Sequence, residues 1–162
     1  MKVRDIQKSD IPSVVSIYNY YIENSVATFE ESRLSDSEME KRINQVHTDG
    51  GRWLIASNGS DITGYAYSGI WQRRSAYRNS VEVTVYVSKD HLSKGVGKAL
   101  YSELFRDPST RSKHAIVAGI TLPNPASIAL HESFGMKKVA HFSEVGFKFD
   151  KWLDVGYWQL VL

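Results

Sequence analysis

The sequence predicts an α/β (α+β) domain spanning residues 1–162, with elements in the order β-α-α-β-β-β-α-β-α-β-β. Its composition, 42% hydrophobic and 23% charged residues, is typical of one soluble globular unit of this length. Apolar residues recur at helical spacing in some segments and alternate or run together in others. Turn signals separate these segments, and neither an internal repeat nor a low-complexity tract interrupts them.

The first third of the chain predicts a strand and two helices. Residues 2–6 form the strand, and a helix follows with Ser9 or Asp10 as its N-cap. Residues 35–46 form a second, more polar helix that opens on a serine–aspartate capping pair and ends near Gly50. The first helix buries one face, which carries Ile11, Val14, Val15, Tyr18, Tyr21 and Ile22.

The middle of the chain is predicted to be rich in β-structure. Residues 53–57 and 62–71 flank the sequence Asn-Gly-Ser-Asp, a strong hairpin signal. In residues 81–87, valines alternate with polar or aromatic side chains. Successive side chains in a strand point to opposite faces, so the valines share one face and the other face carries Glu82, Thr84 and Tyr86.

The last part predicts two helices and three strands. Residues 95–105 form a helix, and residues 115–121 form a nearly continuous apolar strand, as expected at the centre of a sheet. Asn124 and the proline after it begin another helix, which stops at a glycine. The closing strands are expected at residues 138–145 and 157–162, around a turn region near residues 149–154.

The composition excludes several classes of function. There is no cysteine, which excludes disulfides, a cysteine nucleophile and a thiolate metal site, and no histidines show metal-ligand spacing. A net charge of +2 is too small for a nucleic-acid footprint. The apolar runs are too short to span a membrane, and no apolar signal core follows Met1. We therefore expect a cytoplasmic protein with no metal, no nucleic-acid partner and no membrane contact.

The segment 85–98 is the most informative for chemistry. A strand leads through a short loop into a helix start that contains Gly95 and Gly97 and is flanked by Lys94 and Lys98. Such a start offers unpaired N–H groups and the positive end of the helix dipole to a phosphate. The alternative is that the two glycines form only a turn and a helix-packing contact. No Walker pattern is present, which argues against a nucleotide-triphosphate hydrolase.

This loop resembles the acyl-CoA pyrophosphate loop of the GNAT superfamily of N-acetyltransferases. Gly95 and Gly97 match the pattern (Gln/Arg)-x-x-Gly-x-(Gly/Ala), while Leu92 departs from it, and residues 124–136 resemble the later helix of the superfamily. The resemblance implies a GNAT fold, a mixed central sheet splayed at the acyl-CoA site with flanking helices. It implies acetyl-CoA as co-substrate, bound by Val85, Tyr86, Val87, Ser93, Lys94, Gly95, Val96, Gly97, Lys98, Asn124 and Ser133.

The sequence is similar to one branch of that superfamily, the phosphinothricin and methionine sulfoximine N-acetyltransferases. The matching segments lie at residues 66–71, 74–77, 81–87, 146–148 and 152–160, and the similarity runs from about Ile11 to Leu160. The resemblance implies transfer of acetyl to the α-amino group of a small amino acid. It also implies a homodimer whose second subunit closes the acceptor site. Without cysteine, an acetyl-cysteine relay is excluded, so direct attack in a ternary complex is expected.

Two residues are candidates for acid–base work. Glu82 interrupts a valine-rich strand and matches the proposed base of the branch, and the alternative is a structural pair with Arg73, Arg74 or Arg78. The resemblance implies that His131, on the later helix, protonates the leaving thiolate, and the alternative is that it only lines the pantetheine channel. The resemblance also implies that a main-chain N–H near Val87 meets the oxyanion.

The acceptor site is expected to bind an anionic group. A guanidinium suits a carboxylate or phosphinate, and the substrate-binding candidates are Phe29, Glu30, Arg74, Ser75, Ala76, Tyr77 and Lys148. Other functions stay open, namely acetylation of a peptide N-terminus or a polyamine, or a non-catalytic acyl-CoA-binding module. A polyamine would need an acidic pocket, which the arginines oppose.

Overall fold

The computed structural model describes residues 1–162 and contains one seven-stranded mixed sheet in the order β1-β2-β3-β4-β5-β7-β6. Every predicted strand and helix is present, and a short helix, α4, was not predicted. The elements are β1 (Lys2–Asp5), α1 (Ile11–Asn24), α2 (Asp36–Thr48), β2 (Trp53–Asn58), β3 (Asp61–Ile70), β4 (Ser80–Val87), α3 (Val96–Arg106), α4 (Pro108–Arg111), β5 (Ala115–Leu122), α5 (Pro125–Ser133), β6 (Lys137–Lys148) and β7 (Lys151–Val161).

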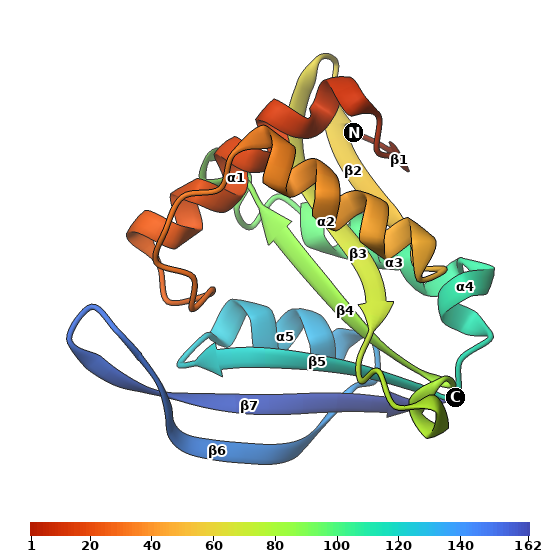
Figure 1. The fold of residues 1–162 in the computed structure, drawn as a ribbon, viewed down its shortest axis with the longest axis vertical. Coiled ribbons are helices and arrows are strands. Elements are labelled where there is room, and N and C mark those ends of the chain that lie inside the picture. The colour runs from red at the N-terminus through yellow and green to blue at the C-terminus, as the bar shows by residue number, and fades with distance from the viewer.

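Helices cover both faces of the sheet (Figure 1), and each face has its own core. Helices α1 and α2 pack on one face, where Val14, Ile22 and Met39 are buried against β2 and β3. Helix α3 packs on the other face, where Leu100 and Leu104 are fully buried. The alternation predicted for β4 is confirmed, because its valines join the α3 core while Tyr86 packs against the α1 core.

The sheet splits between β4 and β5. These strands are parallel and are paired only from Ser80 to Glu82, opposite Ala115 to Val117, and Figure 1 shows them diverging beyond that point. All other pairs in the sheet are antiparallel. The split leaves the last five residues of β4 with a free side, since they pair with β3 alone.

The closing hairpin departs from the prediction. The turn lies within the expected region 149–154 but takes only Phe149 and Asp150, because β6 and β7 are longer than predicted and continue to it. Both turn residues have positive φ, 52° and 56°, and no glycine marks so tight a turn in the sequence. The long hairpin places Gly146 and Lys148 beside the segment that follows α1.

The structure also bears on membrane-spanning helices and on metal sites. No helix has both the length and the apolarity needed to cross a membrane. No group of three or more histidine, aspartate or glutamate side chains is arranged to hold a metal ion.

Candidate active site

A cavity of about 820 Å³ occupies the split between β4 and β5. Its volume lies within the range of small-molecule and cofactor sites. The start of α3 and the start of α5 form its walls, together with the residues that follow α1. The predicted site residues that line it are Glu82, Val85, Tyr86, Val87, Ser93, Gly95, Val96, Gly97, Lys98, Asn124 and His131.

The start of α3 is built as an anion site. Gly95 is the N-cap, with φ of +79° and no side-chain cap, and the first helical hydrogen bond runs from Ala99 N–H to Gly95 C=O. The N–H groups of the first turn are therefore free, at the positive end of the dipole. A Cβ added to Gly97 would lie 3.0 Å from Leu130 Cδ2, so this glycine allows close packing of α3 on α5 at the edge of the cavity. The Nδ1 atom of His91, which also lines the cavity, is buried without a partner.

The free side of β4 supplies main-chain donors to the same cavity. Ser88 N–H donates to Thr63 C=O, toward β3. Backbone groups alternate along a strand, so those of Val85 and Val87 point the other way, into the split. Tyr21 Oη donates to Val87 C=O at 2.6 Å, which leaves the Val87 N–H available to an oxygen in the cavity.

Glu82 lies at the branching point of the split with no partner. It is the last residue of β4 that pairs with β5, and its side chain faces the cavity. No ion pair joins it to the arginines proposed as its structural partners, and Arg73 pairs instead with Asp49 at 3.5 Å. Burial raises the pKa of Glu82, with no cation nearby to lower it. A carboxylate with a raised pKa and no partner is suited to accept a proton near neutral pH.

His131 is buried in a pair with Tyr101. Its Nδ1 lies 2.7 Å from Ser127 C=O and its Nε2 lies 2.9 Å from Tyr101 Oη. Because a carbonyl can only accept, Nδ1 carries the proton and Nε2 accepts from Tyr101. Burial lowers the pKa of His131, which keeps the imidazole neutral at pH 7.

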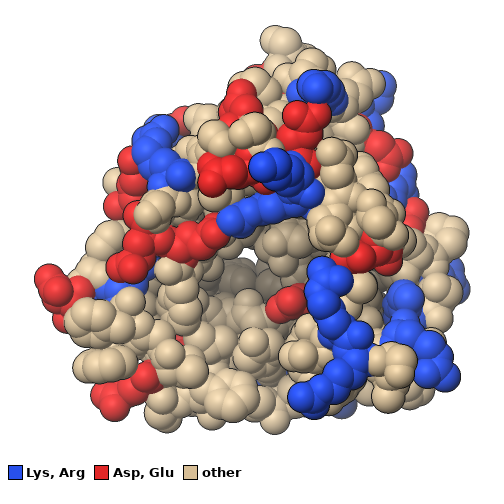
Figure 2. All heavy atoms as spheres, viewed as in Figure 1, with Lys and Arg blue, Asp and Glu red and all other residues tan.

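The arginine segment forms a second hollow on the same face of the sheet as Glu82. Arg74, Ser75 and Tyr77 line this hollow of about 230 Å³, whose other basic residues are Arg73, Arg78 and Lys113. Gly69, directly opposite Glu82 in the β3–β4 register, also lines it. Ser80, two residues before Glu82, does so as well, which places the hollow about 7 Å along the strand from Glu82. In Figure 2, which views the molecule as in Figure 1, basic side chains gather beside a central depression.

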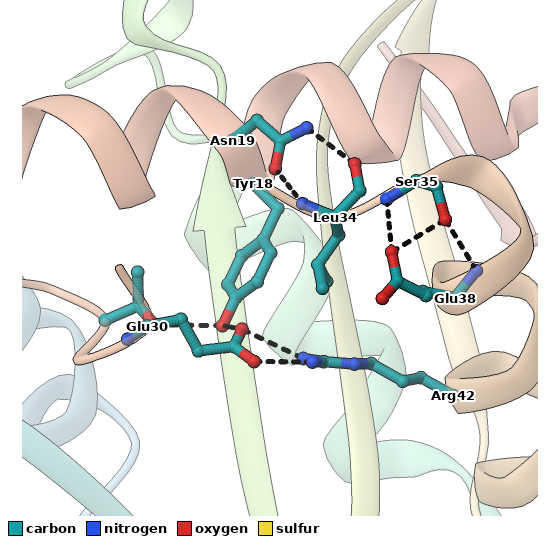
Figure 3. Close-up of polar contacts among 8 residues, drawn as sticks. Tyr18, Asn19, Glu30, Leu34, Ser35, Glu38 and Arg42 are labelled. Atoms are coloured by element: carbon teal, nitrogen blue, oxygen red, sulfur yellow. Dashed lines mark hydrogen bonds and ion pairs between the residues drawn. The ribbon is translucent and has the colours of Figure 1, made fainter. Parts of the chain in front are cut away.

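The predicted acceptor residues Glu30, Lys148 and Phe29 make contacts with other residues of the chain. Glu30 accepts from both Arg42 and Tyr18 (Figure 3). Lys148 is 2% exposed and donates to main-chain carbonyls, and the Phe29 ring packs on Gly146.

Six predicted site residues therefore line neither hollow. Phe29, Glu30 and Lys148 fix the segment after α1, and Ala76 lines neither hollow. Ser133 is exposed and its hydroxyl donates to Leu130 C=O, away from the cavity. Lys94 also falls outside the lining and donates to Asp90 C=O.

Several cavity residues escaped prediction. Ser25, Val26 and Ala27 wall the cavity although their sequence carries no chemical signal. Tyr21 and Tyr101 line it too, from helices in which an aromatic residue at apolar spacing is indistinguishable from a core residue.

Similarities to known proteins agree with this geometry. Residues 3–156 match the family model of the acetyltransferase (GNAT) domain. The chain is 35% identical over 159 residues to the phosphinothricin N-acetyltransferase of Streptomyces viridochromogenes, which covers 98% of this chain and 86% of the relative.

Two solved structures are similar over nearly the full length. The ribosomal-protein-alanine N-acetyltransferase of Brucella melitensis superimposes with a TM-score of 0.96 at 32% identity, covering 100% of both chains. The phosphinothricin acetyltransferase of Sinorhizobium meliloti in complex with AcCoA superimposes with a TM-score of 0.93 at 34% identity, covering 99% of this chain and 88% of that one.

Proposed function

The chain belongs to the GNAT family and is an acetyl-CoA-dependent N-acetyltransferase, and from that premise we propose that its acceptor is a small amino acid with a tetrahedral, anionic or oxidised side-chain group. The acetyl group goes to the α-amino nitrogen of phosphinothricin, methionine sulfoximine, methionine sulfone or a similar compound. The proposal covers the whole of residues 1–162 as one catalytic domain in the cytoplasm.

One observation carries the choice of acceptor. Glu82 has no partner in the cavity, and the hollow lined by Arg74 reaches Ser80, two residues nearer the start of β4 on the same face. An amino acid bound with its anionic groups at the arginines can therefore place its amine at Glu82. A polyamine is disfavoured, because four cations surround that hollow and Asp49 is its only acid.

The proposed reaction uses groups at the start of α3 and along the free side of β4. The free N–H groups at the start of α3 hold the coenzyme diphosphate, and the acetyl thioester lies in the split between β4 and β5. Glu82 accepts the proton of the acceptor ammonium, and the free amine attacks the thioester carbonyl. The Val87 N–H donates to the oxygen as negative charge develops on it. The new C–N bond forms, the C–S bond breaks, and the thiolate leaves and takes up a proton.

We assign His131 to the channel wall rather than to the acid role. Its Nε2 already accepts the Tyr101 hydroxyl, and a neutral imidazole with that tautomer has no proton to give at Nε2. Its contribution is to hold Tyr101 in place on the cavity wall.

We also propose that the protein is a homodimer. The β6–β7 hairpin exposes large apolar side chains, each about half or more accessible, and monomers seldom leave such a set uncovered. These side chains are Phe142, Val145, Phe147, Phe149 and Trp152. Light scattering during size-exclusion chromatography tests this proposal, and a monomer at micromolar concentration would refute it.

The acceptor is tested by thiol release from acetyl-CoA. Phosphinothricin, methionine sulfoximine and methionine sulfone are compared with the common amino acids, spermidine and a peptide with N-terminal alanine. The peptide is included because the Brucella melitensis protein is named for ribosomal-protein alanine. The highest kcat/KM is expected for one of the first three compounds, and preference for the peptide or spermidine would overturn the proposal.

A further inference from the structure

Lys148 is a buried amine without a carboxylate partner. It is 2% exposed at the end of β6, and its Nζ donates to Ser25 C=O and Thr28 C=O, both at 2.8 Å. Burial lowers the pKa of Lys148, while Glu31 and Glu30 act in the opposite direction. An amine in such a place costs more free energy than an apolar side chain of the same length. Stability alone therefore does not account for it.

The two carbonyls that Lys148 holds flank the cavity wall. Ser25, Val26 and Ala27 line the cavity, and Thr28 follows directly. Tyr86 Oη, from β4, lies 3.4 Å from Ala27 C=O and adds a weaker contact to the same segment. The wall is thus a stretch of main chain whose position depends on groups that lie outside it.

A second contact joins the same two regions. The Phe29 ring lies over Gly146 so closely that a Cβ on this glycine would collide with it. Strand β6 therefore contacts the segment 25–29 twice, through Lys148 and through Gly146. The hairpin that supplies both residues also carries the exposed apolar side chains Phe147, Phe149 and Trp152.

The far end of the segment is fixed independently. Arg42 and Tyr18 hold Glu30, Tyr18 also contacts Thr28 at 2.8 Å, and Asn19 exchanges hydrogen bonds with Leu34 (Figure 3). Loss of Lys148 would consequently free the residues at the cavity without releasing the link to α2.

We infer that Lys148 is a positioning residue, which fixes the main chain of residues 25–28 as a wall of the cavity that Glu82 also lines, and does not itself touch the acceptor. This inference rests on the proposed function for the identity of the acceptor. It also links the hairpin to the site, because anything that moves β6 moves the wall.

The test compares Lys148→Met with Lys151→Met. Methionine has nearly the length of lysine but donates no hydrogen bond, and Lys151 is an exposed lysine on the same hairpin. Hydrogen bonds of a charged donor are strong enough that their loss should raise the acceptor KM about tenfold or more. The KM for acetyl-CoA should stay within about twofold, and hydrogen–deuterium exchange of residues 25–30 should be about tenfold faster. Lys151→Met should match the wild type in all three.

Three outcomes overturn the inference: an unchanged acceptor KM, an equal rise of both KM values, or unchanged exchange in residues 25–30. Where Lys148→Met is too unstable to assay, Lys148→Gln keeps one donor and should give the same effects at smaller size. The exchange measurement needs no acceptor. If no tested amine is acetylated by the wild type, the proposed acceptor fails while exchange still decides the role of Lys148.

Discussion

The proposed coenzyme end and the proposed acceptor end of the site differ in the groups that form them, which are main-chain groups at one end and side chains and loops at the other. At the coenzyme end, main-chain N–H groups from one continuous stretch, the end of β4 and the start of α3, face the cavity. At the proposed acceptor end, parts of the chain that are remote in sequence meet: residues from 49–51, 69–81 and 109–113 line the arginine hollow, and Lys148 holds Ser25, 123 residues away, on the wall of the large cavity. A backbone site tolerates changes of side chain, as Leu92 illustrates, whereas a side-chain site can change its ligand with a few substitutions.

The largest effect is expected from a substitution at the proposed coenzyme end. In Gly97→Asp the added Cβ meets Leu130 and the carboxylate faces a diphosphate, so the KM for acetyl-CoA should rise roughly thousandfold, or ~4 kcal/mol. Steady-state kinetics measure it. Gly59→Asn is the control, since its added Cβ has nothing within 4 Å and asparagine tolerates the φ of +60° at this position. Unaltered coenzyme binding in Gly97→Asp would move the diphosphate elsewhere.

Substitution of Glu82 tests the junction of the two ends. Its pKa is raised by burial, so the carboxyl group loses its proton and can act as base only above that raised value, and the wild-type rate should fall as pH drops. Glu82→Gln should lower kcat about 100-fold at neutral pH and less at high pH, where more acceptor is already unprotonated.

The pH–rate profiles of Glu82→Gln and of Glu103→Gln, an exposed carboxylate on α3, provide the comparison. A profile of Glu82→Gln that parallels the wild type would assign the base to another group.

Arg74→Ala is expected to weaken binding of the acceptor and not of acetyl-CoA. Loss of a charged donor to an anionic group should raise the acceptor KM about 10- to 30-fold while the KM for acetyl-CoA changes less than about twofold. Arg106→Ala, an exposed arginine on α3, serves as control. Equal effects of Arg74→Ala on both substrates would make this arginine structural.

The smallest effect is expected at the wall between the two ends. His131→Asn should reduce kcat by less than about tenfold, because the side chain orients Tyr101 and transfers no proton. Burial lowers the pKa of His131, so it is neutral above pH 7 and should add no feature to the wild-type pH profile there. A basic limb that disappears in His131→Asn would restore the acid role.

Much of the fold could be predicted, because its signals are local. Apolar residues at helical spacing predicted α1 and α3, and the alternation of residue types predicted which face of β4 each side chain occupies. Asn124 with Pro125 predicted the start of α5. The turn between the last two strands was expected near residues 149–154, but its restriction to Phe149 and Asp150 was not predicted, because no glycine marks the positive φ values there.

The candidate site divides in the same way. Glu82, Gly95 and Gly97 were predicted and line the cavity, since a strand ending in a glycine loop places its groups within a few residues. Lys148 and Glu30 were predicted to bind the acceptor, but each is held by residues of the protein that are remote in sequence. No spacing rule signals such partners.

The sequence by itself determined the order of elements, the glycine loop at the start of α3 and the position of Glu82 on β4, because those features depend on neighbours within one or two turns or a single strand. Tertiary structure alone decided that Glu82 forms no ion pair with the arginines and that His131 accepts a hydrogen bond from Tyr101. It also decided that Lys148 donates to the main chain beside the cavity. Each of these outcomes depends on which distant groups come within 3 to 4 Å, a property that only the packed chain defines.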